Sequence, residues 1–182
     1  MRKLALALVV TGSLALSIIA TPAMAMIETP EAKAAATDAA ADAHANMVAT
    51  FGVDALRPGQ YLWDDEAGDG EARVVISLSN QMAYLYRGER LAAVTTISSG
   101  KPGKDTPTGY FPILQKKPMH RSAKYDNAPM PYMQRIDTYG IALHAGMNPG
   151  RPASHGCVRL PTKFAAKLFA VTRVGTPVMI GA

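Results

Sequence analysis

The feature that most constrains the fold is a run of alternating residues near the middle of the chain. Over residues 73–79 every second residue is large and apolar, and two further β-rich segments, 82–86 and 91–98, follow after short turns. A period of two is typical of strands, and short turns join antiparallel neighbours. The pattern therefore predicts an antiparallel meander.

The rest of the chain adds shorter strands and one amphipathic helix. We expect strands at 61–63, 110–114 and 178–180, and a long irregular loop over 115–137. Phe164, Leu168 and Val171 form one apolar stripe, which predicts a helix over 162–171 with Thr162 as its N-cap. The expected fold class is mainly β, a sandwich or barrel-like domain with one helix near its C-terminal end.

The first 25 residues have the pattern of a secretory signal peptide. Arg2 and Lys3 precede an apolar run, 4–20, and Ala23 and Ala25 occupy the small positions of a cleavage site. The alternative is an uncleaved anchor, but the run is short for a membrane span of about 20 residues. We therefore expect an exported protein in the periplasm or cell envelope, which contacts the membrane only during export.

Residues 26–72 are interpreted as a lead-in to a domain at 73–182. The part up to residue 50 is rich in alanine, which favours a linker or a loosely held helix. Loss of Arg2 and Lys3 with the signal peptide lowers the formal charge from +5 to +3, by two positive charges. This mild excess suits an anionic polymer such as a cell wall, and no aromatic–basic pattern for nucleic acid occurs.

One segment, residues 141–161, contains the residues suited to nucleophilic chemistry. It holds the only cysteine, Cys157, together with His144 and His155. A free thiol has a pKa of about 8.5, so it needs a neighbouring base to act as a nucleophile at neutral pH. Cys157 follows His144 by 13 residues rich in Gly and Pro, and follows His155 by two, so both imidazoles are candidate bases.

Two neighbours of the thiol extend this hypothesis. Gly156 offers an uncovered backbone N–H for an oxyanion hole, and Arg159 is suited to a substrate carboxylate or to bracing the loop. The competing interpretations are a buried structural cysteine and a zinc site of His144, His155 and Cys157. The zinc spacing matches no usual pattern and lacks a fourth ligand, so we expect no metal and no organic cofactor.

The run 154–160, Ser-His-Gly-Cys-Val-Arg-Leu, preceded by a histidine at a strand end, resembles the signature of the L,D-transpeptidase catalytic domain, the YkuD-like family. The resemblance extends over residues 73–180. It implies that Cys157 is the nucleophile and His144 the general base. It also implies supporting roles in the motif for Ser154, His155, Gly156 and Arg159. A segment that overhangs the cysteine would form a substrate groove, with Tyr132 and Met133 as its residues.

The resemblance further implies a substrate and a reaction. Such an enzyme forms a thioester with a peptidoglycan tetrapeptide stem, releases D-Ala and transfers the acyl group to an amine, with no cofactor. Basic residues of the loop, Lys116, Lys117 and Arg121, are candidates to attract stem carboxylates. The acceptor stays open between another stem, a D-amino acid and an envelope protein. The alternatives are an L,D-carboxypeptidase with water as acceptor and a non-catalytic cell-wall binding module.

Overall fold

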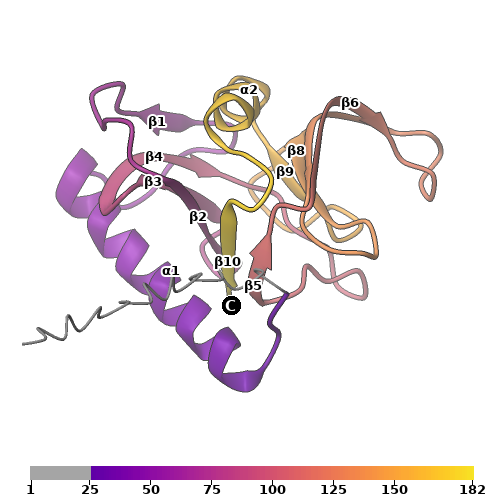
Figure 1. Cartoon of the computed structure of the whole chain (residues 1–182), viewed down its shortest axis with the longest axis horizontal. Helices are drawn as coiled ribbons and strands as arrows, with labels where there is room; N and C mark the ends of the chain where they lie inside the picture. The colour runs from indigo at the N-terminus through magenta and orange to yellow at the C-terminus, as the bar shows by residue number, and fades with distance from the viewer. Residues whose placement is uncertain (1–25) are drawn as a thin grey trace, which may run out of the picture.

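The computed structural model describes residues 26–182, so the predicted signal peptide lies outside the described residues. The described chain forms two sheets and two helices (Figure 1). The helices are α1 (Pro30–Phe51) and α2 (Thr162–Val171). The strands are β1 (Tyr61–Trp63), β2 (Ala72–Ser77), β3 (Met82–Arg87), β4 (Arg90–Thr96), β5 (Gly109–Pro112), β6 (Gln115–Arg121), β7 (Pro129–Arg135), β8 (Ala142–Ala145), β9 (Val158–Leu160) and β10 (Pro177–Gly181).

The larger sheet has six strands in the order β1-β4-β3-β2-β10-β5. Its β2, β3 and β4 are consecutive and antiparallel, which confirms the predicted meander. The closing strand β10 lies between β2 and β5 and is parallel to β2, because α2 carries the chain back across the molecule before it enters the sheet. The mainly β fold predicted from the sequence is therefore correct.

The smaller sheet has four strands in the order β6-β7-β8-β9. The prediction of a long irregular loop over residues 115–137 is wrong, because β6 and β7 form an antiparallel hairpin over most of this segment. Only the connection between them, residues 122–128, is a loop, and Figure 1 shows it extending from the body of the molecule. Adjacent β8 and β9 are parallel.

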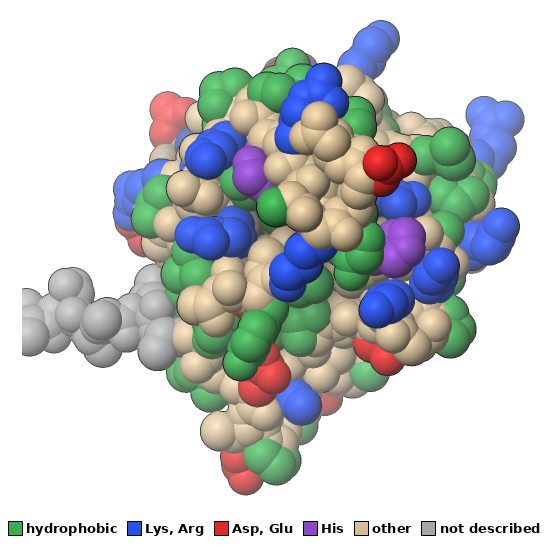
Figure 2. Space-filling view, turned by 90° about the vertical axis from the view of Figure 1, so that its right-hand side faces the viewer, with side chains coloured by type: hydrophobic (Ala, Val, Ile, Leu, Met, Phe, Trp, Pro, Cys, Tyr) green, Lys and Arg blue, Asp and Glu red, His purple; other side chains and the backbone are tan. Residues whose placement is uncertain are grey.

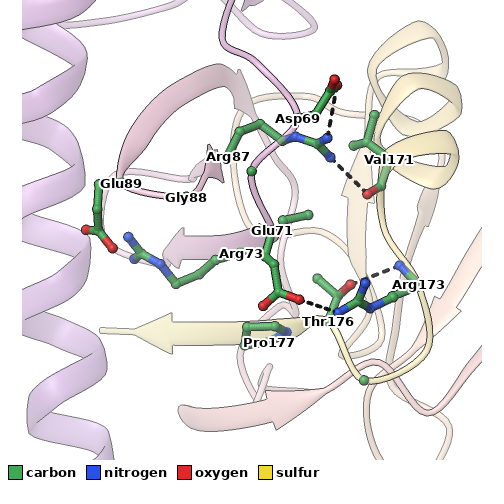
Figure 3. Close-up of a pocket in the computed structure, with 13 residues that line it drawn as sticks. Asp69, Glu71, Arg73, Arg87, Gly88, Glu89, Val171, Arg173, Thr176 and Pro177 are labelled. Carbon is green, nitrogen blue, oxygen red and sulfur yellow. Dashed lines mark hydrogen bonds and ion pairs between the residues drawn. The ribbon is translucent and has the colours of Figure 1, made fainter.

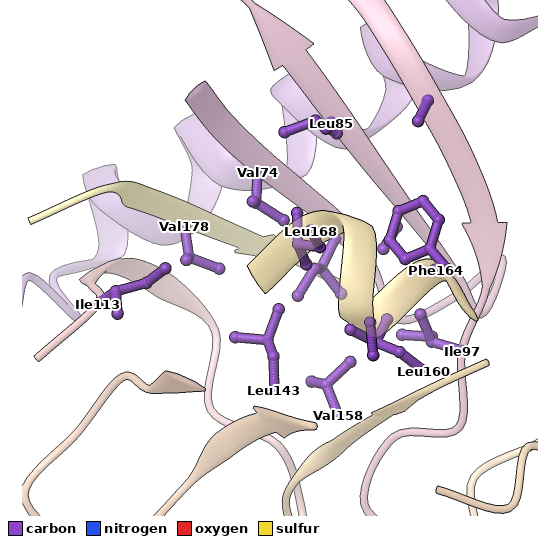
Figure 4. Close-up of a cluster of buried hydrophobic side chains, with 14 of the residues drawn as sticks. Val74, Leu85, Ile97, Ile113, Leu143, Val158, Leu160, Phe164, Leu168 and Val178 are labelled. Carbon is purple, nitrogen blue, oxygen red and sulfur yellow. The ribbon is translucent and has the colours of Figure 1, made fainter. Parts of the chain in front are cut away.

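The main core lies between the two sheets and is closed by α2 (Figure 4). Leu143 and Val158 from the smaller sheet meet Val74 and Val178 from the larger one, and Phe164 from α2 packs beside them. These side chains are 0–1% exposed. The smaller sheet is therefore fixed on one face by a dry core, which leaves its other face for a site.

A second core lies on the opposite face of the larger sheet, under α1. Alternation along β3 sends Leu85 into the main core and Tyr84 toward α1, where Ala40 and Met47 cover it. The interpretation of this region as a linker or loosely held helix therefore differs from the structure. Three of the four buried positions of α1 are alanine, so the helix backbone approaches the sheet closely, and a Cβ on Gly181 would lie 2.5 Å from the carbonyl oxygen of Ala36.

The ends of both helices have identifiable causes. The hydroxyl of Thr29 accepts the N–H of Ala32 at the start of α1, and Gly52 ends that helix in the left-handed conformation (φ 68°). Helix α2 has the predicted bounds, but the N-cap is Pro161 and not Thr162, and no side chain caps this end. Neither described helix is long and apolar enough to cross a membrane.

Candidate active site

Strands β8 and β9 have the main core on one face and the candidate site on the other. The register pairs Leu143 with Val158 and His144 with Arg159. Because side chains alternate along a strand, the first pair enters the main core and the second pair faces the opposite side. Cys157 stands two residues before Arg159 and therefore shares the face of His144.

That face forms the wall of a cavity of about 1200 Å³. The opposite wall comes from the β6–β7 loop, and the turn between β7 and β8 closes one side. The residues that line it include Cys157, His144, His155, Ser154 and Arg159, together with His120, Lys124, Tyr125, Met130, Pro131, Tyr139, Ile141 and Met147. The structure thus brings five residues predicted from the sequence into one cavity.

His144 is held in a defined tautomer. Its Nδ1 lies 2.8 Å from the carbonyl oxygen of Ala145. A carbonyl only accepts hydrogen bonds, so Nδ1 carries the proton and Nε2 keeps its lone pair in the neutral ring. Burial lowers the pKa of His144, the bond to Ala145 opposes this, and the charge of Arg159 lowers it further. The imidazole is therefore neutral and basic at neutral pH.

Cys157 is half-buried, and its sulfur lies 3.8 Å from the carbonyl oxygen of Gly140, to which the thiol donates. The side chain packs against a small apolar cluster of Met130, Met133 and Ala142. Burial raises the pKa of the Cys157 thiol, the backbone N–H of Ala142 opposes this, and the Asp137 carboxylate adds to it. Cys157 and His144 therefore rest as a neutral pair, not as a thiolate and an imidazolium.

Ser154 and Gly156 shape the turn that carries the nucleophile. The Ser154 hydroxyl donates to the carbonyl oxygen of Cys157 (2.5 Å) and accepts the N–H of Gly156 (3.0 Å). Gly156 has φ 111°, and a Cβ there would lie 2.6 Å from Cδ1 of Ile141. In this structure the N–H of Gly156 donates to Ser154, and its role in an oxyanion hole stays a prediction. Its conformation and the close approach of Ile141 explain why this residue is glycine.

His155 lies at the rim of the cavity and is exposed. Its ring stacks on Tyr125 of the β6–β7 loop, with ring centres 4.4 Å apart. Slight desolvation and the charges of Lys101, Arg159 and Lys104 lower the pKa of His155. It therefore connects the nucleophile turn to the opposite wall, while His144 is the buried base candidate.

Arg159 is a cation whose guanidinium has no partner within residues 26–182. Its backbone pairs with Ser98, but it takes part in none of the four ion pairs of that region. Its aliphatic stem lies over Gly146, where a Cβ would come within 3.1 Å. Figure 2 shows the side of the molecule that carries β6, with Lys and Arg side chains scattered over it. Asp126 also lines the cavity but forms no ion pair with Arg159, so this guanidinium is available to an anionic group of a ligand.

The two residues predicted for the substrate groove lie elsewhere, and so do the three basic residues proposed to attract stem carboxylates, since Lys116, Lys117 and Arg121 do not line the cavity. Neither Tyr132 nor Met133 lines the cavity: Met133 is buried in the cluster beside Cys157, and Tyr132 packs against Phe169 of α2, with ring centres 5.9 Å apart. Tyr132 has φ 55°, although β6 and β7 keep the same register on both sides of it, and Met130 lines the cavity. Lys116 donates to the carbonyl oxygens of Phe169 and Thr172 at the end of α2.

The sequence interpretation missed the turn between β7 and β8. Gly140 supplies the acceptor for the thiol, and Asp137 accepts three backbone N–H groups of this turn, those of Tyr139, Gly140 and Ile141. An Asp three residues before a Gly is a recognisable turn pattern. Its contact with Cys157 is between residues 17 positions apart in the sequence, which no local pattern predicts.

A second hollow lies between the end of β3 and the loop after α2 (Figure 3). It measures about 670 Å³ and is lined by charged residues and glycines. Arg87 points to Asp69 (3.7 Å) and to the carbonyl oxygen of Val171 (3.3 Å), and Arg173 pairs with Glu71. Within residues 26–182, no group of three or more acidic, Cys or His side chains is arranged to hold a metal, here or in the cavity at Cys157.

Comparison with known proteins identifies the family. A sequence profile of the L,D-transpeptidase catalytic domain, YkuD, matches residues 71–180. The chain belongs to the L,D-transpeptidase catalytic-domain family. This is a family of cell-wall enzymes that act on peptidoglycan stem peptides, and the matched residues include both β8 and β9 with Cys157 and His144.

Individual relatives agree with this assignment. The chain is 28% identical over 114 residues to a curated Bacillus licheniformis protein assigned as the L,D-transpeptidase YkuD, covering 59% of this chain and 64% of that protein. An L,D-transpeptidase structure from Stackebrandtia nassauensis is 27% identical, with a TM-score of 0.56 and coverage of 62% and 56%. One from Mycobacterium smegmatis, 21% identical with a TM-score of 0.58 and coverage of 62% and 59%, shares the fold. The chain thus spans less than two thirds of these relatives.

Proposed function

We propose that this protein is an exported peptidoglycan L,D-transpeptidase that uses Cys157 as its nucleophile and His144 as its base. The observation that carries the proposal is the shared face of β8 and β9, from which both side chains line one cavity. Family membership supports the reaction class. The resting pair of neutral thiol and neutral imidazole is suited to general-base catalysis, in which the proton moves as the sulfur attacks.

The first step acylates the enzyme. Nε2 of His144 takes the thiol proton while Sγ of Cys157 attacks the carbonyl carbon of the third stem residue. The backbone N–H of Cys157 is assigned to the oxyanion, because that of Gly156 is bonded to Ser154. Collapse of the tetrahedral intermediate breaks the bond to the terminal D-Ala, whose amine leaves with the proton from His144. A thioester of Cys157 remains.

The second step returns the thiol. An acceptor amine attacks the thioester carbonyl and gives its proton to His144, and the new amide forms as the sulfur leaves. The thiolate then recovers the proton from His144. The unpaired guanidinium of Arg159 is assigned to a carboxylate of the stem peptide, which would be its ion-pair partner.

Export belongs to this proposal because the substrate lies outside the cytoplasm. Cleavage after Ala25 would give a mature chain that begins at Met26. The N-terminal sequence of the protein recovered from the cell envelope tests this step. A first residue at Met1 in that fraction would contradict cleavage.

The mechanism is tested with purified tetrapeptide stems and a labelled D-amino acid. Wild-type protein should incorporate the label and release D-Ala, whereas Cys157→Ala should do neither. Intact mass spectrometry should show the acyl adduct on wild-type protein and none on Cys157→Ala. Label exchange by Cys157→Ala would reject the mechanism, and release of D-Ala without incorporation would identify a carboxypeptidase.

A further inference from the structure

Asp137 is a buried carboxylate that the mechanism above does not use. It is 3% exposed and lies in the turn between β7 and β8. Its Oδ1 accepts the N–H of Tyr139 (3.0 Å), Gly140 (2.7 Å) and Ile141 (2.7 Å). Three successive backbone donors on one charged oxygen define the shape of this turn more strongly than neutral acceptors would.

The turn touches the nucleophile segment at two points. Gly140, in a conformation with φ 103°, presents its carbonyl oxygen to Sγ of Cys157 at 3.8 Å. Ile141 packs so closely over Gly156 that no Cβ fits between them. The turn that Asp137 organises therefore fixes both the thiol and the backbone that carries it.

We propose that Asp137 is a positioning residue for Cys157, which holds the turn in the shape that brings the Gly140 carbonyl to the thiol. The expected effect on kcat rests on the proposed function, but the contact between the Gly140 carbonyl and the Cys157 thiol does not depend on the substrate. Like burial, the negative charge of Asp137 and the hydrogen bond from the thiol to Gly140 favour the protonated thiol, so both raise the pKa of Cys157.

The pH behaviour of the thiol depends on every charged or titratable group that faces it. Asp137 comes from the β7–β8 turn, and Arg159, whose charge opposes that of Asp137, comes from β9. The other titratable groups that line the cavity are His144 on β8, His155 on the nucleophile turn, Tyr139 on the β7–β8 turn, and His120, Lys124, Tyr125 and Asp126 on β6 and its loop. A test must therefore change one charge at a time.

Two substitutions separate the charge of Asp137 from its geometry. Asp137→Asn keeps an oxygen that accepts the three N–H groups but removes the charge, whereas Asp137→Ala removes both. Asp105→Asn is the matched control, because this exposed carboxylate lies on the loop behind the nucleophile turn and outside the cavity. The readouts are the pH midpoint of Cys157 alkylation by iodoacetamide, kcat and KM for stem peptide, and Tm.

We expect Asp137→Asn to move the alkylation midpoint about half a pH unit lower, since one carboxylate charge is lost. Asp137→Ala should lower kcat about 100-fold with little change in KM, the size of effect that a misplaced reacting group produces. Asp105→Asn should match wild type in every readout. Unchanged kcat and an unchanged midpoint in folded Asp137→Ala would overturn the proposal. If that variant fails to fold, Asp137→Ser, whose shorter side chain cannot hold all three N–H groups, is measured in its place.

The alkylation experiment uses no peptidoglycan, so it stays informative if the enzyme proposal fails. A shifted midpoint in a protein that releases no D-Ala would support the role of Asp137 and reject the transpeptidase function. If wild-type protein turns over stem peptide normally, and Asp137→Ala keeps both the wild-type alkylation midpoint and the wild-type kcat, the transpeptidase function is supported and the role of Asp137 is rejected.

Discussion

The two hollows of this molecule differ in whether their arginines have interaction partners within the fold. In the hollow between β3 and the loop after α2, Arg87 and Arg173 face Asp69 and Glu71 (Figure 3). The third arginine there, Arg73, forms no ion pair but lies over the ring of Tyr86, 4.2 Å from its centre, so the fold itself supplies a partner for each of them. In the cavity at Cys157, Arg159 has no counter-charge within residues 26–182, while the thiol and the imidazole beside it have shifted pKa values.

The comparison teaches that volume alone does not mark a functional site. A hollow whose charges are already paired gains little by binding an ion, because a ligand must first displace the resident partner. A cavity that keeps a cation unpaired and a base desolvated has interactions left for a substrate. Substitutions in the two hollows should therefore have different consequences, and the predictions below are ordered by expected size.

Removal of the base should have the largest effect. His144→Ala should lower kcat/KM for D-Ala release about 100- to 10,000-fold, the usual contribution of general acid–base catalysis. His155→Ala should cost about tenfold or less, because this exposed ring only connects the nucleophile turn to Tyr125. The measurement is steady-state kinetics on stem peptides, and the opposite ranking would assign the base to His155.

A methyl group at the nucleophile turn should come next. Gly156→Ala places a Cβ against Ile141 and should lower kcat about 100-fold, because the turn that carries the thiol must shift. Gly103→Ala is the control: its φ of 76° is also positive, but a Cβ there meets nothing within 4 Å. Equal losses in the two variants would mean that backbone strain, and not the close contact, is responsible.

The two hollows are compared directly by removing one arginine from each. Arg159→Gln should raise KM for a stem peptide with a free carboxylate about tenfold, the size of one lost charge-assisted hydrogen bond. Arg173→Gln should leave KM unchanged. A stem peptide whose carboxylate is amidated is the second control. If Arg159 recognises the carboxylate, this peptide should have the same KM with wild-type protein and with Arg159→Gln. Equal KM changes in both variants would break the comparison.

The same pair of variants should separate in their pH profiles. Burial, with the charge of Arg159, holds the pKa of His144 below 6.5, so kcat/KM should stay level as pH falls to that value and decline only in more acidic solution. Arg159→Gln removes a cation that disfavours the imidazolium, so the pKa of His144 rises and the decline begins at higher pH. Arg173→Gln should keep the wild-type profile.

The smallest effect is expected in the hollow with paired charges. Arg173 and Glu71 keep 76% and 83% of their side-chain surfaces exposed. Glu71→Gln should therefore change the free energy of unfolding by about 0.5 kcal/mol or less, because water screens exposed ion pairs. Urea denaturation measures this value. A loss of several kcal/mol would show that this hollow depends on its ion pairs for folding.

The strands of the larger sheet and the nucleophile motif could be predicted from the sequence because their signals are local, whereas the prediction of a loop for β6 and β7 is wrong. Alternation over residues 73–79 and the apolar stripe of α2 each follow from a fixed geometric period. The buried residues of α1, Ala36, Ala40, Ala43 and Met47, do follow a helical period, but alanines on its other faces hide that stripe. The packing of this helix depends on how closely its backbone can approach Gly181. The assignment of Tyr132 and Met133 to the groove rests on the family resemblance, and no local pattern shows that Tyr132 packs against Phe169 and that Met133 is buried beside Cys157.

By itself the sequence determined the chemical inventory: one thiol, two nearby imidazoles, an arginine two residues beyond, and a chain that forms mostly strands. Only the tertiary structure decided which of these residues meet. The parallel register of β8 and β9 places His144 and Cys157 on one face, and the turn held by Asp137 brings Gly140 to the sulfur. The physical reason is that periodicity is a property of neighbours along the chain, whereas a catalytic site is made by contacts between segments that only the folded core aligns.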